Sequence, residues 1–448
     1  MNNFDRELTE RLEALRAQGL HRELRRVDSP QGTRIRIDGR TLLNFSSNDY
    51  LGLAGDPLLK EAAIQAVEKF GAGSGASRLI CGSLAPHHEL EEALANFKGA
   101  EAALSFSTGY ATAIGTICAL LGKNDVIVLD KLVHACIVDA ARLSGAKIRV
   151  FAHNDLEDLE KILKWTRRGE LCESQTKSGT RVTHPSERRR TLIVTESIFS
   201  MDGDAAPLRE IVALKEKHGA WLMVDEAHAT GLYGKNRRGL VEESGAGGQI
   251  EIQMGTLGKA VGASGGYICG SRPLIDFLVN RARSFIFSTA PVPAAAAAAA
   301  AGVRFIQSKA GEDRRKQLFE RINELNSQSA TPINSVSAST RQCRCREHAT
   351  KVGVRNPQLK SAIIPVLIGD ETRAVAASAA LREQGIFVPA IRYPTVARGQ
   401  ARLRLTVTAT HTAEDISLLV AALRSVRNSE KSRARDESRC LQSAIANE

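Results

Sequence analysis

Residues 220–228 read AWLMVDEAH, an apolar run that ends in a cluster of polar and charged residues. Similar short runs stand at 125–130 (DVIVLD), 147–152 (KIRVFA) and 191–197 (TLIVTES), and segments of helical periodicity such as LREIVALKEKHG at 208–219 separate them. Continuous apolar strands that alternate with helices are typical of a parallel sheet covered on both faces. The sequence therefore predicts an α/β fold with a doubly wound, mostly parallel sheet.

The same patterns divide the chain into four parts. Residues 1–44 form an N-terminal arm with one amphipathic helix and a short strand pair, and residues 45–295 form the large domain. Residues 296–426 begin with a long helix and continue into strands and a further helix, which predicts a smaller C-terminal α+β domain. Residues 427–448 are polar and charged, so we expect a disordered tail.

The positive charge lies mainly in two segments. The chain of 448 residues carries a net charge of +11, and residues 166–190 and 341–355 each contribute a net +4. Neither segment shows helical or alternating periodicity, so we interpret both as solvated loops inserted between regular elements. Aromatic residues make up only 4% of the chain, and neither segment combines its charge with stacking residues. We therefore expect no nucleic-acid partner.

The location also follows from composition. No apolar run reaches the roughly 18 residues that a membrane span needs, so we expect no membrane association. The first twenty residues lack the apolar centre of a secretory signal. The eight cysteines are scattered and form no CxxC pair, a pattern that favours a reducing compartment and neither disulfides nor a zinc site. These features predict a cytoplasmic protein without a bound metal.

Polar side chains follow the predicted strands. Asp225 ends the strand at 220–225 and His228 comes three residues later, while Glu196 and Ser200 follow the strand at 191–196. Ligands in open α/β sheets bind beyond the carboxyl ends of the strands. We therefore expect these side chains to line a ligand site.

Two glycine-containing turns complete the pattern. In FSTGYATA, residues 106–113, Gly109 and Tyr110 open a helix whose free backbone N–H groups can hold a phosphate. In GTLGKAVGASGGY, residues 255–267, Lys259 stands among small residues. A phosphate cradle, a buried carboxylate, a histidine and an amine together suit pyridoxal 5'-phosphate, which needs a partner for its phosphate, its ring nitrogen and its aldehyde.

Each residue alone has a simpler interpretation. Asp225 could cap a helix, His228 could be a hydrogen-bonded core histidine, and Lys259 could hold a phosphate as a point charge. A glycine before a helix is common. The order of phosphate turn, Asp-x-x-His and then a lysine about thirty residues later is much less common by chance, and favours the cofactor.

Long motifs give the sequence a family resemblance. They are NFSSNDYLGL (44–53), GSGASRLICGSLAPHHELEEALANF (73–97), DKLVHACIVDA (130–140), TESIFSMDGD (195–204), VDEAHATG (224–231), GTLGKAVGASGGY (255–267) and AIRYPTVARGQARLRLTVTATHT (390–412). The chain resembles the α-oxoamine synthases, pyridoxal-phosphate enzymes of the aspartate-aminotransferase fold (fold type I), from about residue 10 to 425. Within the family it is most similar to the branch that condenses L-alanine with a pimeloyl thioester.

The resemblance implies roles for matching positions. The implied catalytic residues are Lys259, which would bond the cofactor covalently, Asp225 on the pyridine nitrogen, His228, and His134 stacked on the ring. The other implied cofactor-binding residues are Gly109, Tyr110, Ser200 and Thr256, with Ser288 and Thr289 reaching the phosphate of a partner subunit in a homodimer. The implied substrate-binding residues are Arg22, Asn48, His134, Thr395 and Arg404.

The resemblance leaves alternatives open. Glycine C-acetyltransferase, 5-aminolevulinate synthase and serine palmitoyltransferase share the cofactor residues, and the acyl carrier could be coenzyme A or acyl carrier protein. A regulator on the same fold would need a DNA-binding domain that the 40-residue arm cannot supply. A binding protein without activity is expected to lack Lys259 or Asp225, and both are present. The chain departs from the family pattern at Thr112, where asparagine is common, and at Asn236-Arg237, where a glycine is usual.

Overall fold

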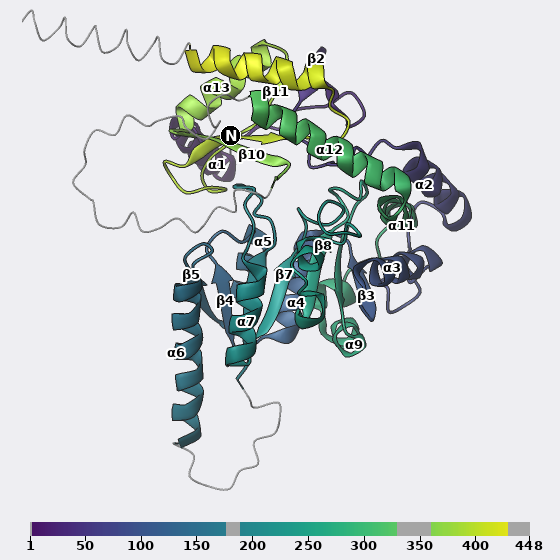
Figure 1. The fold of residues 1–448 in the computed structure, drawn as a ribbon, viewed down its shortest axis with the longest axis vertical. Coiled ribbons are helices and arrows are strands. Elements are labelled where there is room, and N and C mark those ends of the chain that lie inside the picture. The colour runs from purple at the N-terminus through teal and green to yellow at the C-terminus, as the bar shows by residue number, and fades with distance from the viewer. Residues whose placement is uncertain (1, 176–188, 329–359, 429–448) are drawn as a thin grey trace, which may run out of the picture. The chain divides into compact units, whose positions relative to one another are not determined.

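The computed structural model describes residues 2–175, 189–328 and 360–428 (Figure 1). The basic segment 341–355, residues 176–188 of the other basic segment and residues 429–448 of the predicted tail lie outside the described residues. The described residues form two compact units, one of residues 51–315 and one of residues 2–50, 316–328 and 360–428. Each unit is described by itself.

A seven-stranded sheet is the centre of the larger unit. Its strand order is β3-β9-β8-β7-β6-β4-β5, in which β8, β7, β6, β4 and β5 pair in parallel and β9 pairs antiparallel with both β3 and β8. The strands are β3 (Ala102–Phe106), β4 (Val126–Asp130), β5 (Lys147–Phe151), β6 (Thr191–Glu196), β7 (Trp221–Asp225), β8 (Ile252–Thr256) and β9 (Gly266–Gly270). The predicted α/β fold with a mostly parallel sheet is confirmed.

Helices cover both faces of this sheet. All five residues of β4 are buried, which a strand achieves only when neither face meets water. One core cluster joins alternate strand residues, among them Ile127 and Leu129, to apolar residues of α4, α5 and α9. The helices are α2 (Pro57–Phe70), α3 (Ala85–Lys98), α4 (Gly109–Leu120), α5 (Ala135–Ser144), α6 (Leu156–Gln175), α7 (Leu208–His218), α8 (Leu240–Glu243), α9 (Arg272–Arg281), α10 (Arg283–Ile286) and α11 (Pro293–Gln307), and α12 (Lys309–Gln328) follows. No helix in the described ranges is both long and apolar enough to cross a membrane.

The smaller unit contains two short sheets. The arm helix α1 (Asn3–Ala17) precedes β1 (Arg34–Ile37) and β2 (Arg40–Asn44), which form one sheet with β11 (Ile386–Phe387). The second sheet contains β10 (Ile363–Gly369), β13 (Ala401–Thr406) and β12 (Ala390–Ile391). Helix α13 (Glu371–Glu383) and a helix over residues 413–428 complete the unit. The predicted arm helix and strand pair, and the predicted C-terminal strands, are confirmed.

One expectation about the basic segments is wrong. Residues 166–175 were expected to belong to a loop, yet they continue α6 to Gln175, and α6 lies beside α7 (Figure 1). Extending an existing helix costs far less than starting one, because each added residue gains a hydrogen bond without a new nucleus. The arginine, glutamate and leucine residues of this segment favour helix, so weak periodicity did not prevent it.

A buried ion pair lies beside the sheet. Lys98, at the end of α3, and Glu226, which follows β7, are fully buried and their charged atoms are 2.5 Å apart. Lys98 also donates to the backbone carbonyl of Arg238 and to the hydroxyl of Thr230. Burial by itself lowers the pKa of Lys98, but the Glu226 carboxylate holds it above its usual range. The pair is therefore charged and depends on both partners.

Removing one partner should destabilise the fold strongly. Lys98→Met leaves the Glu226 carboxylate buried without a cation, which costs about 3–5 kcal/mol of unfolding free energy. A matched control is Lys217→Met, which breaks an exposed pair with Glu160 and should cost less than about 1 kcal/mol. Urea denaturation followed by circular dichroism measures both changes. If Lys98→Met and Lys217→Met lower the unfolding free energy by the same small amount, the prediction that the buried pair matters more for stability is wrong.

Candidate functional site

Carboxyl groups end neighbouring strands at one edge of the large sheet. Glu196 is the last residue of β6 and Asp225 the last of β7, and the two are partners in the parallel register. Both side chains are buried. The parallel strands deliver them to the same edge, where ligands bind in folds of this type.

The two carboxyl groups are electrostatically perturbed. Burial raises the pKa of Glu196 to about 8, with the adjacent Asp225 adding to the effect. Burial also raises the pKa of Asp225, although Lys259 opposes this. Glu196 Oε2 accepts the Ser200 N–H at 3.1 Å, while Glu196 Oε1 has no hydrogen-bond partner among the described residues. This edge thus offers acceptor oxygens suited to a cationic or N–H-bearing ligand.

Lys259 and His228 meet at the same edge. The Lys259 Nζ atom lies 2.7 Å from His228 Nε2. His228 is in the turn after β7, and Lys259 is in the turn after β8 that the Gly262 N–H closes onto the Lys259 carbonyl at 2.9 Å. Gly262 has a φ of 77°, and a Cβ there would lie 2.5 Å from the Cβ of Leu53. The glycine therefore lets the lysine turn lie close against the segment that contains Leu53.

The start of α4 forms a cradle for an anion. Thr108 is the N-cap, and Gly109 and Tyr110 are the first two helical residues, whose N–H groups have no partner within the helix. A Cβ on Gly109 would lie 3.9 Å from the Thr256 hydroxyl at the end of β8. Helix-terminal N–H groups beside a hydroxyl form a binding place for phosphate.

Gly266 on β9 permits this arrangement. A Cβ at Gly266 would lie 2.4 Å from Thr112 Oγ1 and 2.8 Å from the backbone nitrogen of Gly109. The Thr112 hydroxyl in turn donates to the Thr108 carbonyl at 2.8 Å. Threonine at position 112 thus fits the helix start without displacing it.

Two further predicted residues lie on loops at this edge. His134 is the N-cap of α5 and accepts the Cys136 N–H at 3.3 Å, in the loop that follows β4. Ser200 is buried in the loop that follows β6. The structure therefore brings His134, Ser200, Asp225, His228 and Lys259 to the ends of three adjacent strands and the turn after β8.

Ser288 and Thr289 occupy the surface of the unit. Thr289 pairs with Ser77 in an isolated β-bridge, and the Ala290 N–H donates to the Ala76 carbonyl at 3.0 Å. The Ser288 hydroxyl donates to the Thr289 carbonyl at 3.1 Å. The adjacent Phe287 is 71% exposed, so apolar surface adjoins the turn.

Of the predicted substrate residues, His134 belongs to the larger unit and the other four belong to the smaller unit. Arg404 is buried on β13 and donates to Asn48 Oδ1 at 3.1 Å and to the Thr406 hydroxyl at 3.0 Å. Arg22 donates to the Tyr393 carbonyl at 3.4 Å, and the Thr395 N–H donates to the Arg392 carbonyl at 3.0 Å. The structure thus groups Asn48 with Arg404, and Arg22 with the segment that contains Thr395.

The departure at Arg237 has a structural counterpart. Arg237 has a φ of 63°, the left-handed conformation that glycine adopts at no cost. Its guanidinium donates to the Ile306 carbonyl at 2.6 Å and to Glu312 at 2.7 Å. These charge-assisted bonds offset the backbone strain where the family commonly has a glycine.

The sequence did not predict which contacts the buried polar side chains make with one another. Glu196 was noticed as a strand-end carboxyl, but its unpartnered oxygen and its register with Asp225 appear only in the folded sheet. His153 and Asn154, in the turn after β5, were not among the predicted site residues. A polar pair shortly after a predicted strand was the available signal. The structure bonds them to Asp130 and Asp204.

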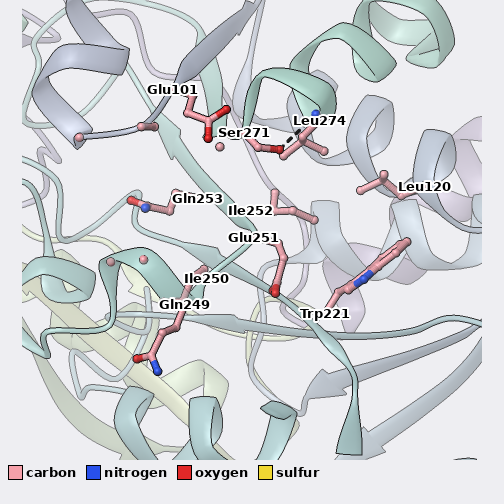
Figure 2. Close-up of a pocket in the computed structure, with 15 residues that line it drawn as sticks. Glu101, Leu120, Trp221, Gln249, Ile250, Glu251, Ile252, Gln253, Ser271 and Leu274 are labelled. Atoms are coloured by element: carbon pink, nitrogen blue, oxygen red, sulfur yellow. Dashed lines mark hydrogen bonds between the residues drawn. The ribbon is translucent and has the colours of Figure 1, made fainter.

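A cavity of about 440 Å³ lies elsewhere in the large unit (Figure 2). Trp221 and Ile252, which line it, begin β7 and β8, so the cavity is at the amino edge of the sheet. Its carboxylates already have partners, since Glu251 accepts from Lys215 at 2.5 Å and Glu101 accepts the Arg272 N–H at 2.9 Å. Within the described ranges, no group of three or more His, Cys, Asp or Glu side chains could hold a metal ion.

The donor set at the carboxyl edge fits pyridoxal 5'-phosphate. A buried carboxylate suits a protonated ring nitrogen, the amine of Lys259 suits the aldehyde, and the start of α4 suits the phosphate. The Glu196 oxygen without a hydrogen-bond partner, beside Asp225, leaves an acceptor at this edge for a donor group of the ligand.

Comparison with known proteins assigns the class. Residues 40–423 match the model of the class I and II aminotransferase family, so the chain belongs to that family. This fold and family are pyridoxal-phosphate-dependent, as the sequence predicted.

The relatives are more specific. The chain is 45% identical over 414 residues to a protein of Geotalea daltonii named 8-amino-7-oxononanoate synthase, covering 92% of this chain and 96% of the relative. A serine palmitoyltransferase from S. paucimobilis with a bound PLP–myriocin aldimine is 29% identical, with a TM-score of 0.80 over 96% of this chain and 99% of that one. A solved 8-amino-7-oxononanoate synthase from Francisella tularensis is 25% identical, with a TM-score of 0.65 over 87% and 99%. The resemblance predicted from the motifs is confirmed.

The carboxyl pair should leave a signature in stability. Below its raised pKa of about 8, folded Glu196 holds a proton that the unfolded chain releases near 4.5, so this group's contribution falls as pH rises from about 4.5 to about 8. Glu196→Gln should reduce that decline in the ligand-free protein, measured as unfolding temperature against pH. Glu160→Gln is the control, because the pKa of this exposed carboxyl is lowered to about 2 and lies outside the window. A decline that Glu196→Gln leaves unchanged would contradict the raised pKa.

Proposed function

We propose that the protein binds pyridoxal 5'-phosphate and condenses L-alanine with a pimeloyl thioester. The products would be 8-amino-7-oxononanoate, carbon dioxide and the free thiol of the acyl carrier, a step of biotin biosynthesis. The observation that carries the proposal is the Lys259–His228 pair, 2.7 Å apart, at the strand edge where Asp225 is buried. The 45% identity to a protein named for this activity supports the choice of substrates.

The residues of the large unit supply the chemistry around the cofactor. When bound, pyridoxal phosphate bonds an amine through its aldehyde and takes up the electron pair left at the substrate's α-carbon. Asp225 would keep the ring nitrogen protonated, and His228 and Ser200 would donate to the phenolic oxygen. Lys259 Nζ is the base proposed to take the α-proton, and His228 Nε2 at 2.7 Å orients it.

Binding groups would hold the rest of the cofactor. The N–H groups of Gly109 and Tyr110 and the hydroxyl of Thr256 would hold the phosphate, and His134 would stack on the ring. The α4 helix adds its N-terminal dipole to these contacts.

Substrate recognition is proposed for residues of the smaller unit. Arg404, held by Asn48 and Thr406, would bind the carboxylate of the amino acid. Arg22 and Thr395, together with His134, would contact the acyl substrate. We also propose a cytoplasmic location, with either coenzyme A or acyl carrier protein as the acyl carrier.

A substrate screen tests the function. Wild-type protein with added pyridoxal phosphate should release carbon dioxide fastest with L-alanine and a pimeloyl thioester, compared with glycine or serine and acetyl, succinyl or palmitoyl thioesters. Pimeloyl-coenzyme A and pimeloyl acyl carrier protein are assayed side by side. Preference for glycine with acetyl or succinyl thioester, or for serine with palmitoyl thioester, would instead assign a sister activity.

Lys259→Ala is the control in this screen. It should lose the visible absorbance of the lysine-bound cofactor, and borohydride should fix no cofactor to the protein, because the amine proposed to bond the aldehyde is removed. Turnover should fall by several orders of magnitude. Reductive labelling at a different lysine would refute the assignment.

We also propose that the active form is a homodimer that shares its sites. Phe287 exposes apolar surface beside the Ser288-Thr289 turn, which suits a two-fold interface that builds two sites at once. Mixed dimers of Lys259→Ala subunits with Ser288→Ala/Thr289→Ala subunits should regain one sound site. At equal amounts about a quarter of all sites would then be sound. Sedimentation that shows an active monomer, or subunit exchange without recovery, would contradict sharing.

A further inference from the structure

His153 joins two loops at the carboxyl edge of the large sheet. It follows β5, and its Nδ1 lies 3.0 Å from Asp130 Oδ1 while its Nε2 lies 2.8 Å from Asp204 Oδ2. Asp130 ends β4, and Asp204 is in the loop after β6. A carboxylate accepts and does not donate, so a ring that bonds both carboxylates needs a proton on each nitrogen.

The surroundings favour that protonated ring. Burial by itself lowers the pKa of His153, but its hydrogen bonds to Asp130 and Asp204 raise it to about 10. These two aspartates are the charged groups that face the ring among the described residues. The rings of His153 and Phe199 pack edge to face, with centroids 4.3 Å apart and an interplanar angle of 88°.

Asn154 completes the link. Its backbone N–H donates to Asp130 Oδ2 at 3.0 Å, and its side chain donates to the Ala205 carbonyl at 3.1 Å. Its φ of 56° is a conformation that asparagine tolerates better than most residues. Two consecutive residues after β5 thus bond both neighbouring loops.

Each of these loops carries a residue of the proposed cofactor site. Asp130 Oδ1 also accepts the Leu132 N–H at 2.8 Å, in the segment that leads to His134. The Phe199 N–H donates to the Asp204 carbonyl at 2.9 Å, which closes the turn that contains Ser200. The position of each aspartate therefore determines the path of the backbone to His134 or to Ser200.

We propose that His153 is a positioning residue for the cofactor: its doubly protonated ring holds Asp130 and Asp204 together and thereby sets His134 and Ser200. The inference rests on the proposed cofactor site. It assigns no contact between His153 and the cofactor, since the histidine acts through the two loops.

The first test uses the ligand-free protein. NMR of protein with isotope-labelled histidine nitrogens should show both ring nitrogens of His153 protonated from about pH 7 to about pH 9. The His153 signal is assigned by its loss in His153→Ala. A ring that loses a proton near the ordinary histidine pKa of about 6.5 would overturn the proposal.

The second test measures cofactor affinity and its chemical rescue. His153→Ala should weaken pyridoxal phosphate binding by roughly tenfold to a hundredfold, by analogy with groups that orient metal ligands. Added imidazole should restore affinity, because between Asp130 and Asp204 it can donate from both nitrogens as the His153 ring does, and 1-methylimidazole should not, because it lacks one donor. His88→Ala is the control, since His88 is exposed and has one bond to Ser83. Wild-type affinity in His153→Ala, or equal rescue by both compounds, would overturn the proposal.

A milder variant covers the case in which His153→Ala fails to fold. Asp204→Asn keeps the shape of the side chain and removes one of the two charges that raise the pKa of His153. A raised histidine pKa stabilises the charged contact below that pKa and loses it as pH rises through it. Cofactor affinity of Asp204→Asn should therefore fall with rising pH at a lower pH than in wild type. If cofactor affinity falls over the same pH range in Asp204→Asn as in the wild type, the proposal is overturned. A wild-type protein that binds no cofactor would instead refute the proposed function itself.

Discussion

The burial of two adjacent carboxyl groups, Glu196 and Asp225, is the constraint on which the site depends. Parallel pairing of β6 and β7 places them in register, and burial raises the pKa of both. An ionised carboxylate without water is stable only beside a cation or hydrogen-bond donors. Lys259 supplies part of that compensation, and a protonated ligand nitrogen would supply more. The buried Asp225 therefore favours a ligand with a cationic or N–H group at the strand ends, and the protonated ring nitrogen of the proposed cofactor would be such a group.

Close backbone approach lets the other groups surround these carboxyls. Gly262 admits the lysine turn beside Leu53, and Gly266 admits β9 beside the start of α4. A side chain at either glycine would overlap its neighbour and move a binding group. The small residues of the lysine turn therefore serve packing, while the lysine itself is the amine proposed for the chemistry.

The sequence predicted strands better than it predicted contacts between them. The apolar runs at 125–130, 191–197 and 220–228 became β4, β6 and β7, because continuous apolar runs bounded by polar turns have few other structures available. The site residues of the large unit could be named from motifs at strand ends for the same reason. The Lys98–Glu226 pair spans 128 residues and the His153–Asp204 bond spans 51, and no local pattern encodes such pairing. The helical course of residues 166–175 was missed because extension of α6 needs no periodicity of its own.

The groups that perform the chemistry cannot by themselves select the substrate. Lys259 would act on atoms that every α-amino acid presents, Asp225 and His228 would act on the cofactor itself, and Arg404, fixed by Asn48 and Thr406, would bind the carboxylate that all these amino acids share. Discrimination must come from contacts to the amino-acid side chain and the acyl chain, where one methylene changes binding by only about 1–3 kcal/mol. Such contacts are spread over many residues of modest individual effect. An alignment at 45% identity that covers 92% of the chain includes these contacts together, and it therefore bears on the substrates in a way that the cofactor residues cannot.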